Sequence, residues 1–267
     1  MAVEEYEQDG VWVIHARPDE ETPGRPPLVF VHGGQHASWS FDHLLPFFAD
    51  RGWECLAFDW FNHGRSRKTD AETFLKRGIG DVTTEIAIVS SLADGPPLLV
   101  GHSMGAAASM AYATSNAVAG LVLLTPVLPA GIGEGEPSEA GEFPVDMKQL
   151  VPPLPLARAR ELFFTSLDEV SARRYTRLLT AESPVAVRQA ATSSLEVDLD
   201  AFDVPSLVVA GGKDRMCAPA SQEKLATVLG SEYFVLESAG HDDVLLHHAA
   251  WQVVAARIHD WLADNIS

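Results

Sequence analysis

The stretch that decides the fold of this chain is Leu-Leu-Val-Gly-His-Ser-Met-Gly-Ala-Ala-Ala, residues 98–108. Its first residues belong to a short apolar run, residues 96–100, that predicts a buried strand. The small residues at the end of the stretch predict the start of a helix. Between the two, Gly101 and Gly105 carry no Cβ, so the strand and the helix can approach each other closely. The sharp turn predicts a strained backbone at Ser103, with its hydroxyl lifted above the sheet edge.

A strand, a Gly-x-Ser-x-Gly turn and a helix in this order are typical of a nucleophile elbow. The five residues alone also fit a glycine-lined turn with a buried serine, because the pattern occurs by chance. The predicted strand before them and the predicted helix after them favour the elbow. In an elbow, Ser103 is the nucleophile, and the Met104 N–H at the helix N-terminus points at a developing oxyanion.

The composition predicts one α/β domain with an insertion. The chain has 267 residues, of which 46% are hydrophobic and 21% are charged, so it can bury a large core. Its formal net charge of −18 argues against nucleic acid or an anionic membrane as a partner. The net charge says little about the substrate.

The cysteines and the first residues favour a cytoplasmic protein. Two cysteines, Cys55 and Cys217, do not make a disulfide framework, and we expect both to be reduced. The acidic residues 1–7 contain no apolar signal sequence. The most apolar region, residues 96–132, is interrupted by glycine and polar residues, so we expect strand, helix and strand there and no membrane span.

Alternating strands and helices predict an α/β fold with a mostly parallel sheet covered by helices on both faces. Strands are expected at residues 3–7, 11–15, 28–31, 54–59, 96–100, 120–125, 205–210 and 232–236. Helices are expected at residues 38–49, 73–92, 106–114, 221–229 and 251–266. In such a sheet the functional site lies outside the carboxyl ends of the strands.

The pattern changes within residues 129–200, where we expect several short helices and no buried strand. We interpret residues 129–200 as a helical cap inserted between two parts of the core, residues 1–128 and 201–267. The apolar residues of the cap either face the serine or bury the cap on the core, and the sequence does not sort them. From them we assign Met147, Phe163 and Phe164 to the substrate pocket.

A glycine loop, His-Gly-Gly-Gln-His at residues 32–36, follows the buried strand 28–31. Such a loop, upstream of the elbow, is where a second oxyanion donor is expected. We select the Gly34 N–H as this donor, with the Gln35 N–H as the alternative. The glycines could also serve only to make a tight turn.

Two histidines in this loop, His32 and His36, have a spacing that can hold a metal on a helix. The glycines between them argue against a helix, and no glutamate accompanies them as in zinc proteases. We therefore expect no metal and no cofactor.

The loop after strand 54–59 contributes further candidates for the pocket. Asp59 is expected to fix the turn by hydrogen bonds and not to perform chemistry. Trp60 and Phe61 either wall the pocket or are core aromatics, and we include them in the pocket together with Gln35.

A serine hydroxyl needs a base within hydrogen-bond reach, and the base needs a group that orients it. Asp214 and His241 each follow a predicted strand. We assign His241 as base and then acid, and Asp214 as the carboxylate that orients it. The alternatives are a surface-loop histidine and a turn aspartate. Asp242 and Asp243 are rival carboxylates, but residues next to His241 in the chain rarely meet its ring squarely.

Five segments together resemble the α/β-hydrolase fold family. They are Val-His-Gly-Gly at 31–34, Asp59 with His-Gly-Arg-Ser at 63–66, Gly-His-Ser-Met-Gly at 101–105, Gly-Gly-Lys-Asp at 211–214 and Ser-Ala-Gly-His at 238–241. The order serine, aspartate, histidine along the chain is that of the family. The resemblance covers residues 3–266 and implies an eight-stranded, mostly parallel sheet, a cap after the sixth strand and a serine-hydrolase triad.

The resemblance also implies a serine hydrolase that cleaves a carboxylic ester or lactone through an acyl-enzyme. The apolar cap suggests a small or medium, largely uncharged substrate molecule. A thioesterase or a carbon–carbon bond hydrolase would use the same triad, and a ligand sensor without catalysis could use the same scaffold. Haloalkane dehalogenases and epoxide hydrolases of this family carry aspartate at the nucleophile, so Ser103 argues against both.

Overall fold

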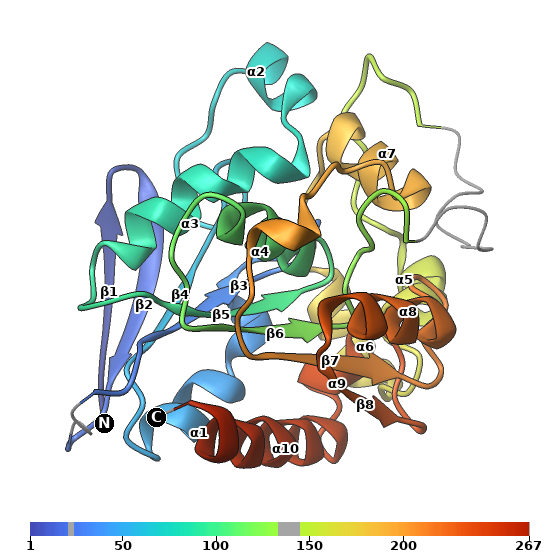
Figure 1. Ribbon diagram of the computed structural model, residues 1–267. Coiled ribbons are helices and arrows are strands. Elements are labelled where there is room, and N and C mark those ends of the chain that lie inside the picture. The colour runs from blue at the N-terminus through green and yellow to red at the C-terminus, as the bar shows by residue number, and fades with distance from the viewer. Residues whose placement is uncertain (21–23, 133–144, 267) are drawn as a thin grey trace.

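A computed structural model describes residues 1–20, 24–132 and 145–266 of the chain. Eight strands form one sheet in the order β1-β2-β4-β3-β5-β6-β7-β8 (Figure 1). The pairs β1–β2 and β2–β4 are antiparallel, and the pairs from β4 onward to β8 are parallel. The predicted eight-stranded, mostly parallel sheet is therefore confirmed. The strands are β1 (Ala2–Gln8), β2 (Val11–Arg17), β3 (Leu28–Val31), β4 (Cys55–Phe58), β5 (Leu98–His102), β6 (Gly120–Leu124), β7 (Ser206–Gly211) and β8 (Glu232–Leu236).

Helices cover both faces of the sheet. The α-helices are α1 (Leu44–Ala49), α2 (Ala71–Lys76), α3 (Thr83–Ser90), α4 (Met104–Ala113), α5 (Leu156–Leu162), α6 (Glu169–Thr176), α7 (Pro184–Thr192), α8 (Pro219–Leu229), α9 (Asp243–Leu246) and α10 (Ala250–Asn265). Short 3-10 helices are η1 (Ser38–Phe41), η2 (Ile79–Val82) and η4 (Leu199–Ala201). Helices α1 and α10 pack on one face, and α3, α4 and α8 pack on the other (Figure 1).

The central strands consist mostly of apolar residues because both of their faces are buried. In β3, Leu28 and Phe30 join the core on the side of α1 and α10, whereas Val29 and Val31 join the core on the side of α4. All four side chains are fully buried. An uninterrupted apolar run is therefore the expected sequence of a strand in this sheet.

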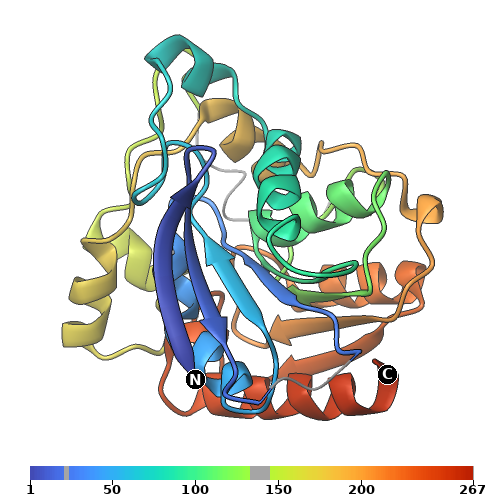
Figure 2. The same ribbon diagram turned by 90° about the vertical axis from the view of Figure 1, so that its left-hand side faces the viewer.

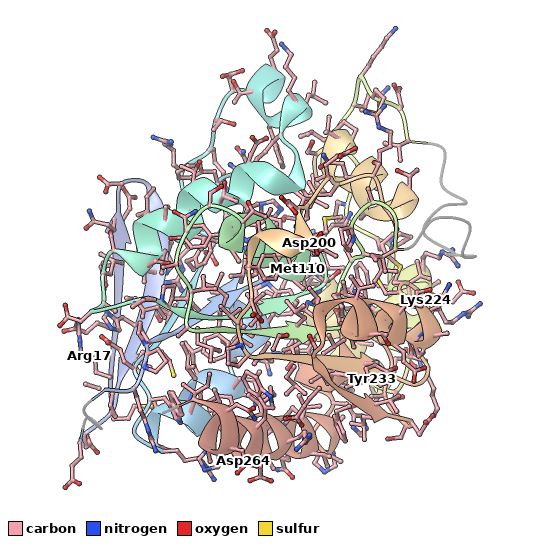
Figure 3. All side chains as sticks on the ribbon, viewed as in Figure 1. Arg17, Met110, Asp200, Lys224, Tyr233 and Asp264 are labelled. Atoms are coloured by element: carbon pink, nitrogen blue, oxygen red, sulfur yellow. The ribbon has the colours of Figure 1, made fainter. Side chains whose placement is uncertain are left out.

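The sheet twists strongly between β1 and β8, as Figure 2 shows. Met110 of α4 is fully buried. The charged residues Arg17, Lys224 and Asp264 lie toward the edges of the molecule in Figure 3, and Lys224 and Asp264 are exposed. Within the three described ranges, the search for a helix long and apolar enough to cross a bilayer finds none.

Two predicted helices are broken into shorter pieces. Residues 38–49 form η1 and then α1, because Pro46 has no N–H to continue a helix and is accepted only in the first turn of a new one. Residues 73–92 are interrupted after Lys76, where Arg77 adopts an extended backbone, and the helix restarts through η2. Helix α9, directly after His241, was not predicted.

The stretch between β6 and β7 contains α5, α6 and α7, and we call its residues 145–198 the β6–β7 segment. Within these residues the chain contributes no strand to the sheet, although Val151 and Glu182 form an isolated bridge. Phe164 and Tyr175 connect the segment to the core, where the Tyr175 ring stacks on Trp39. Residues 133–144 of the predicted cap lie outside the described residues.

Candidate active site

Ser103 occupies the turn between β5 and α4 with a strained backbone, φ 54° and ψ −121°. Both positions of the motif require glycine because backbone atoms of neighbouring residues come very close to them. A Cβ on Gly105 would lie 2.2 Å from the Val31 carbonyl oxygen, and a Cβ on Gly101 would lie 2.6 Å from the Cα of Ala106. The predicted close contact of strand and helix at these glycines is confirmed.

His241 connects the serine to an aspartate. Its Nε2 lies 2.9 Å from the Ser103 Oγ, and its Nδ1 lies 2.8 Å from the Asp214 Oδ2. The three residues follow β5, β7 and β8, whose carboxyl ends meet at one edge of the sheet. They are at most 8% exposed. The arrangement can remove the serine proton and hold the resulting imidazolium against a carboxylate.

Asp214 is the carboxylate that meets the ring of His241. Its Oδ1 accepts hydrogen bonds from the N–H groups of Met216 and Cys217, at 2.8 and 3.0 Å. These bonds fix the carboxylate so that Oδ2 faces the imidazole. The two rivals bond elsewhere, because Asp242 pairs with a different histidine and Asp243 accepts from the backbone of residues 166 and 240.

The surroundings of His241 favour its protonated form. Burial lowers the pKa of this imidazole, but the Asp214 carboxylate raises it, and Asp242 and Asp243 add to the effect. The net pKa of His241 is raised above the ordinary value of 6.5. A base with a raised pKa accepts a proton from serine more readily.

A second buried charge cluster lies behind His241. The Asp242 Oδ2 is 2.7 Å from the Nε2 of His36, and the other ring nitrogen of His36 is 2.6 Å from the Gly34 carbonyl oxygen. Both ring nitrogens of His36 thus face acceptors. Burial raises the pKa of Asp242, but the charge of His36 and the hydrogen bond to it outweigh burial and bring the pKa of Asp242 to about 2. Burial lowers the pKa of His102 to about 3, so this neighbour stays neutral.

Two backbone N–H groups, those of Gly34 and Met104, are available for an oxyanion. The hydrogen bonds found within the described residues use neither of them. The Gln35 N–H, the alternative donor, instead donates to the Glu182 Oε2 at 3.0 Å. A Cβ on Gly34 would lie 2.5 Å from the sulfur of Met104, so the flexible Met104 side chain would have to move to make room for it.

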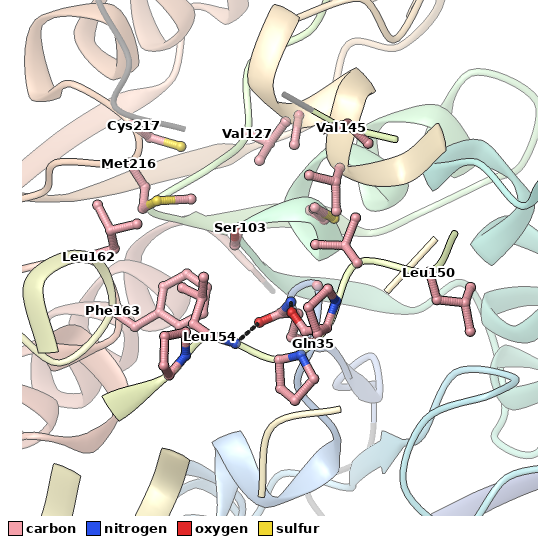
Figure 4. Close-up of a pocket in the computed structure, with 18 of the residues that line it drawn as sticks. Gln35, Ser103, Val127, Val145, Leu150, Leu154, Leu162, Phe163, Met216 and Cys217 are labelled. Carbon is pink, nitrogen blue, oxygen red and sulfur yellow. Dashed lines mark hydrogen bonds between the residues drawn. The ribbon is translucent and has the colours of Figure 1, made fainter. Parts of the chain in front are cut away.

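A cavity of about 370 Å³ opens above Ser103. Figure 4 shows Ser103 between Met216 and Leu162 on one side and Leu150 on the other. The lining residues are Gly34, Gln35, Ser103, Met104, Val127, Val145, Asp146, Gln149, Leu150, Val151, Pro152, Pro153, Leu154, Pro155, Leu162, Phe163, Val187, Ala190, Met216 and Cys217. Most of them are apolar, and none of these lining residues is a lysine or an arginine. The cavity therefore suits an uncharged molecule.

Two predicted pocket residues, Gln35 and Phe163, line this cavity, and the Phe163 ring stacks on His241 at 6.0 Å. Four others lie elsewhere, which corrects the prediction for them. Trp60 stacks on His32 in the core, and Phe61 is buried beneath the Arg67 guanidinium.

Met147 and Phe164 are the other two corrections. Met147 is 36% exposed, because it lies in a turn on the outer side of the β6–β7 segment. Phe164 is fully buried and packs on Tyr175, so it holds the segment on the core. Neighbouring residues such as Phe163 and Phe164 point in different directions, and composition alone could not separate them.

The ring nitrogens of the two histidines in the loop after β3 have hydrogen-bond partners within the protein. The His32 Nδ1 faces the Gly33 carbonyl at 2.8 Å, and its Nε2 accepts from the Trp60 N–H at 3.0 Å. Burial lowers the pKa of His32 well below 6.5, which keeps the ring neutral. Asp59 fixes its turn as predicted, since its carboxylate accepts from the N–H groups of Ser38 and Arg65.

Two groups of buried side chains have the spacing of metal ligands. They are His102, His241 and Asp242, and Asp214, Cys217 and His241. Each group includes His241, whose two nitrogens already face Ser103 and Asp214. A metal in either place would displace these contacts.

Several cavity residues gave no signal in the sequence. The wall at residues 151–155 is an extended proline-containing stretch, and Val187 and Ala190 come from α7. Met216 and Cys217 follow Asp214 closely, so their proximity to the predicted aspartate is a signal that could have found them. Glu182 is 2% exposed and accepts a hydrogen bond from the loop after β3. The two partners are 147 residues apart in the chain, so no local sequence pattern predicts the contact.

The model of the alpha/beta hydrolase family matches residues 28–257 of this chain. The pyrethroid hydrolase of Sphingobium wenxiniae is 27% identical over 157 residues, which are 54% of this chain and 52% of that protein. Epoxide hydrolase B of Mycobacterium tuberculosis is 30% identical over 103 residues, 38% of this chain and 28% of that protein. The chain thus matches about half the length of the first relative and less than a third of the second.

Among solved structures, a lipase-esterase related protein from Clostridium acetobutylicum superposes with a TM-score of 0.73. The superposition covers 94% of this chain and 99% of that chain, with 18% identical residues. A likeness at this identity concerns the fold.

Proposed function

This chain belongs to the alpha/beta hydrolase family, and we propose that it is a serine hydrolase that cleaves a carboxylic ester or a lactone. The observation that carries the proposal is the chain of two hydrogen bonds, 2.9 Å from Ser103 to His241 and 2.8 Å from His241 to Asp214. These contacts are what an activated serine requires.

In the acylation step, the Ser103 Oγ attacks the acyl carbon while the His241 Nε2 takes the serine proton. The carbonyl oxygen becomes an oxyanion and accepts hydrogen bonds from the N–H groups of Gly34 and Met104. Each such donor contributes about 10²–10³ to the rate of comparable enzymes. When the tetrahedral intermediate collapses, the proton on His241 passes to the leaving alcohol, and the acyl group stays on Ser103.

In the deacylation step, water replaces the alcohol. The His241 Nε2 takes a proton from the water as its oxygen attacks the acyl carbon, and the same two N–H groups hold the second oxyanion. Collapse breaks the bond to the Ser103 Oγ, which recovers its proton from His241. Throughout, Asp214 keeps its position on Nδ1 and balances the positive charge of the ring.

The β6–β7 segment acts in this proposal as the cap that covers the site and selects the substrate. The walls that it contributes are mostly apolar, with Asp146 and Gln149 as the polar exceptions, and no basic side chain lines the cavity to hold an anionic substrate. A volume of about 370 Å³ accommodates a small to medium molecule. We infer that the substrate is an uncharged ester or lactone with apolar groups.

The names of the two relatives support hydrolysis and differ in the bond that is cleaved. One is a pyrethroid hydrolase and the other is an epoxide hydrolase. Epoxide hydrolases of the resembled family carry an aspartate nucleophile, so Ser103 favours the ester. Thioesters remain the second class to be tested, since a serine acyl-enzyme forms from them equally well.

We expect a fluorophosphonate probe to label Ser103, because such probes react with activated serines. Intact mass and peptide mapping would locate the label, and the substitution Ser103→Ala should abolish it. In a panel of esters, lactones and matched thioesters, the same substitution should lower kcat/KM by about 10⁴–10⁶ through loss of the nucleophile. Circular dichroism would check that the variant stays folded.

The assignment fails if folded wild-type protein is not labelled, or if Ser103→Ala keeps full esterase activity. Faster turnover of thioesters than of matched oxygen esters would instead identify a thioesterase. Tight binding of the panel compounds without turnover or labelling would indicate a sensor.

A further inference from the structure

Gln35 bonds to the β6–β7 segment through every polar group of its main chain and side chain. Its N–H donates to the Glu182 Oε2 at 3.0 Å, and its carbonyl accepts from the Thr180 N–H at 2.9 Å. Its side-chain amide donates to the Pro152 carbonyl at 2.9 Å and accepts from the Leu154 N–H at 3.1 Å. One residue therefore connects the loop after β3 to two separate parts of the segment.

The side-chain connection reaches the cavity. Pro152 and Leu154 line it as part of the wall at residues 151–155, and Gln35 directly follows Gly34, the proposed oxyanion donor. Figure 4 shows the bond between the Gln35 side chain and Leu154 below Ser103. The position of this wall relative to the reacting carbon is thus set through Gln35.

The partner Glu182 is itself held firmly. Its Oε2 also faces the Nε2 of His63 at 2.9 Å, and its Oε1 accepts from the Ser183 N–H at 2.8 Å. Its backbone pairs with Val151 in both directions at 2.9 Å, at the start of the cavity wall. Burial raises the pKa of Glu182, but His63 and the hydrogen bonds outweigh it, so the pKa is lowered and the carboxylate stays charged.

We propose that Gln35 is a specificity-determining residue, whose side-chain amide fixes the wall at residues 151–155 against the oxyanion loop. The inference rests on the proposed function, because it concerns the selection of the ester by the same site. A fixed wall presents a ready-made surface to the longer group of the substrate, and the binding energy there contributes in the transition state. A loose wall must be ordered by each substrate, which lowers that contribution.

The competing explanation is that the wall holds its shape without Gln35. Three of its five residues are Pro152, Pro153 and Pro155, and each proline fixes its own φ. In that case the glutamine would only fill space beside the wall. Substitutions that separate the hydrogen bonds from the volume distinguish the two explanations.

The test compares two variants. Gln35→Met keeps the side-chain volume and removes both side-chain hydrogen bonds, whereas Gln35→Ala removes the volume as well as the two hydrogen bonds. Two ester series would be measured, one lengthened in its acyl group and one in its alcohol, and the readout is kcat/KM of the longest ester over the shortest. In the series that reaches the wall, we expect both variants to reduce this ratio about tenfold, as for the loss of two uncharged hydrogen bonds. A short-chain fluorophosphonate should still label Ser103 in both variants, because the N–H groups of Gly34 and Met104 remain.

An unchanged ratio in Gln35→Met, with a reduced ratio only in Gln35→Ala, would show that volume and not hydrogen bonding matters and would overturn the proposal. Unchanged ratios in both variants would overturn it as well. A failure of the proposed function looks different, since wild-type Ser103 would then not be labelled. If Gln35→Ala does not fold, Gln35→Met alone still decides, because it leaves no cavity behind.

Discussion

The turn around Ser103 and the β6–β7 segment border the same cavity, but different interactions fix them. Strand β5 lies between β3 and β6, and all its residues are buried. Backbone atoms surround its Gly101 and also Gly105 at the start of α4. The β6–β7 segment consists of short helices, one of which exposes 79% of Val170 to solvent. It is attached through particular side chains, among them Gln35, Glu182 and Tyr175.

In the proposed function, this difference between the turn and the segment separates the residues that carry the chemistry from those that select the substrate. The backbone conformation of the turn is fixed, because Ser103 is strained and Gly101 and Gly105 leave no room for a side chain. The segment depends on a few polar contacts, so its walls can change with single substitutions while the sheet remains intact. In the proposed function, the groups that break bonds therefore stand on the rigid part, and the groups that choose the substrate stand on the part with separable contacts.

The largest loss of stability is expected from the substitution Gly105→Ala. The new Cβ would lie 2.2 Å from the Val31 carbonyl and 2.3 Å from that of His32, so α4 must move away from β3. We expect a loss of about 3 kcal/mol or more in the free energy of unfolding, measured with urea, because backbone atoms cannot give way as side chains do. Labelling of Ser103 should fall as well.

Gly80→Ala is the matched control. The nearest atom to its Cβ is a Leu195 methyl at 3.8 Å, which is an ordinary contact. We expect this change to alter the unfolding free energy by less than about 0.5 kcal/mol. Equal effects of the two substitutions would contradict the contrast between the turn and its surroundings.

A smaller effect is expected from Glu182→Gln, which tests the attachment of the β6–β7 segment. Glutamine removes the charge that faces His63, and we expect a loss of about 2 kcal/mol at neutral pH. Because the pKa of Glu182 in the folded protein is lowered below 4.5, its stabilisation is present above that pH and is lost as the pH falls through the folded pKa. The difference in Tm between wild type and variant should therefore shrink on acidification below about pH 4.

Glu169→Gln serves as the control for this measurement. Glu169 pairs with Arg173 on the surface of α6, where both side chains are more than half exposed. We expect a negligible change in stability there, because water and salt screen an exposed ion pair. A Glu182 variant as stable as the Glu169 variant would mean that the buried pair does not hold the segment.

The smallest effect concerns the pH dependence of the proposed reaction. Catalysis needs the neutral form of His241, whose pKa is raised above 6.5 by the carboxylates around it. We expect kcat/KM to rise with pH on the acid side and to level off with a midpoint above 6.5. Asp243→Asn removes one of the carboxylates and should move this midpoint to lower pH. A wild-type midpoint below 6.5 would exclude His241 in this environment as the titrating base.

The strands and the turn could be predicted because their signals are local. Residues 28–31 and 96–100 are short apolar runs, and a strand buried on both faces needs nothing else. The helices were harder, since Pro46 divided one of them and α9 carried no periodic pattern at all. For the pocket, Phe163 and Phe164 are chemically identical neighbours, and their different directions depend on what packs against each.

The sequence by itself determined the order of strands and helices, the place of the Gly-x-Ser-x-Gly turn and the residue types that follow each strand. Only the tertiary structure decided that Asp214 and not Asp242 meets the ring of His241, and that the Gln35 N–H is occupied by Glu182. The reason is physical. Backbone conformation follows from neighbours along the chain, whereas a hydrogen bond between residues 35 and 182 exists only once the whole core has brought them together.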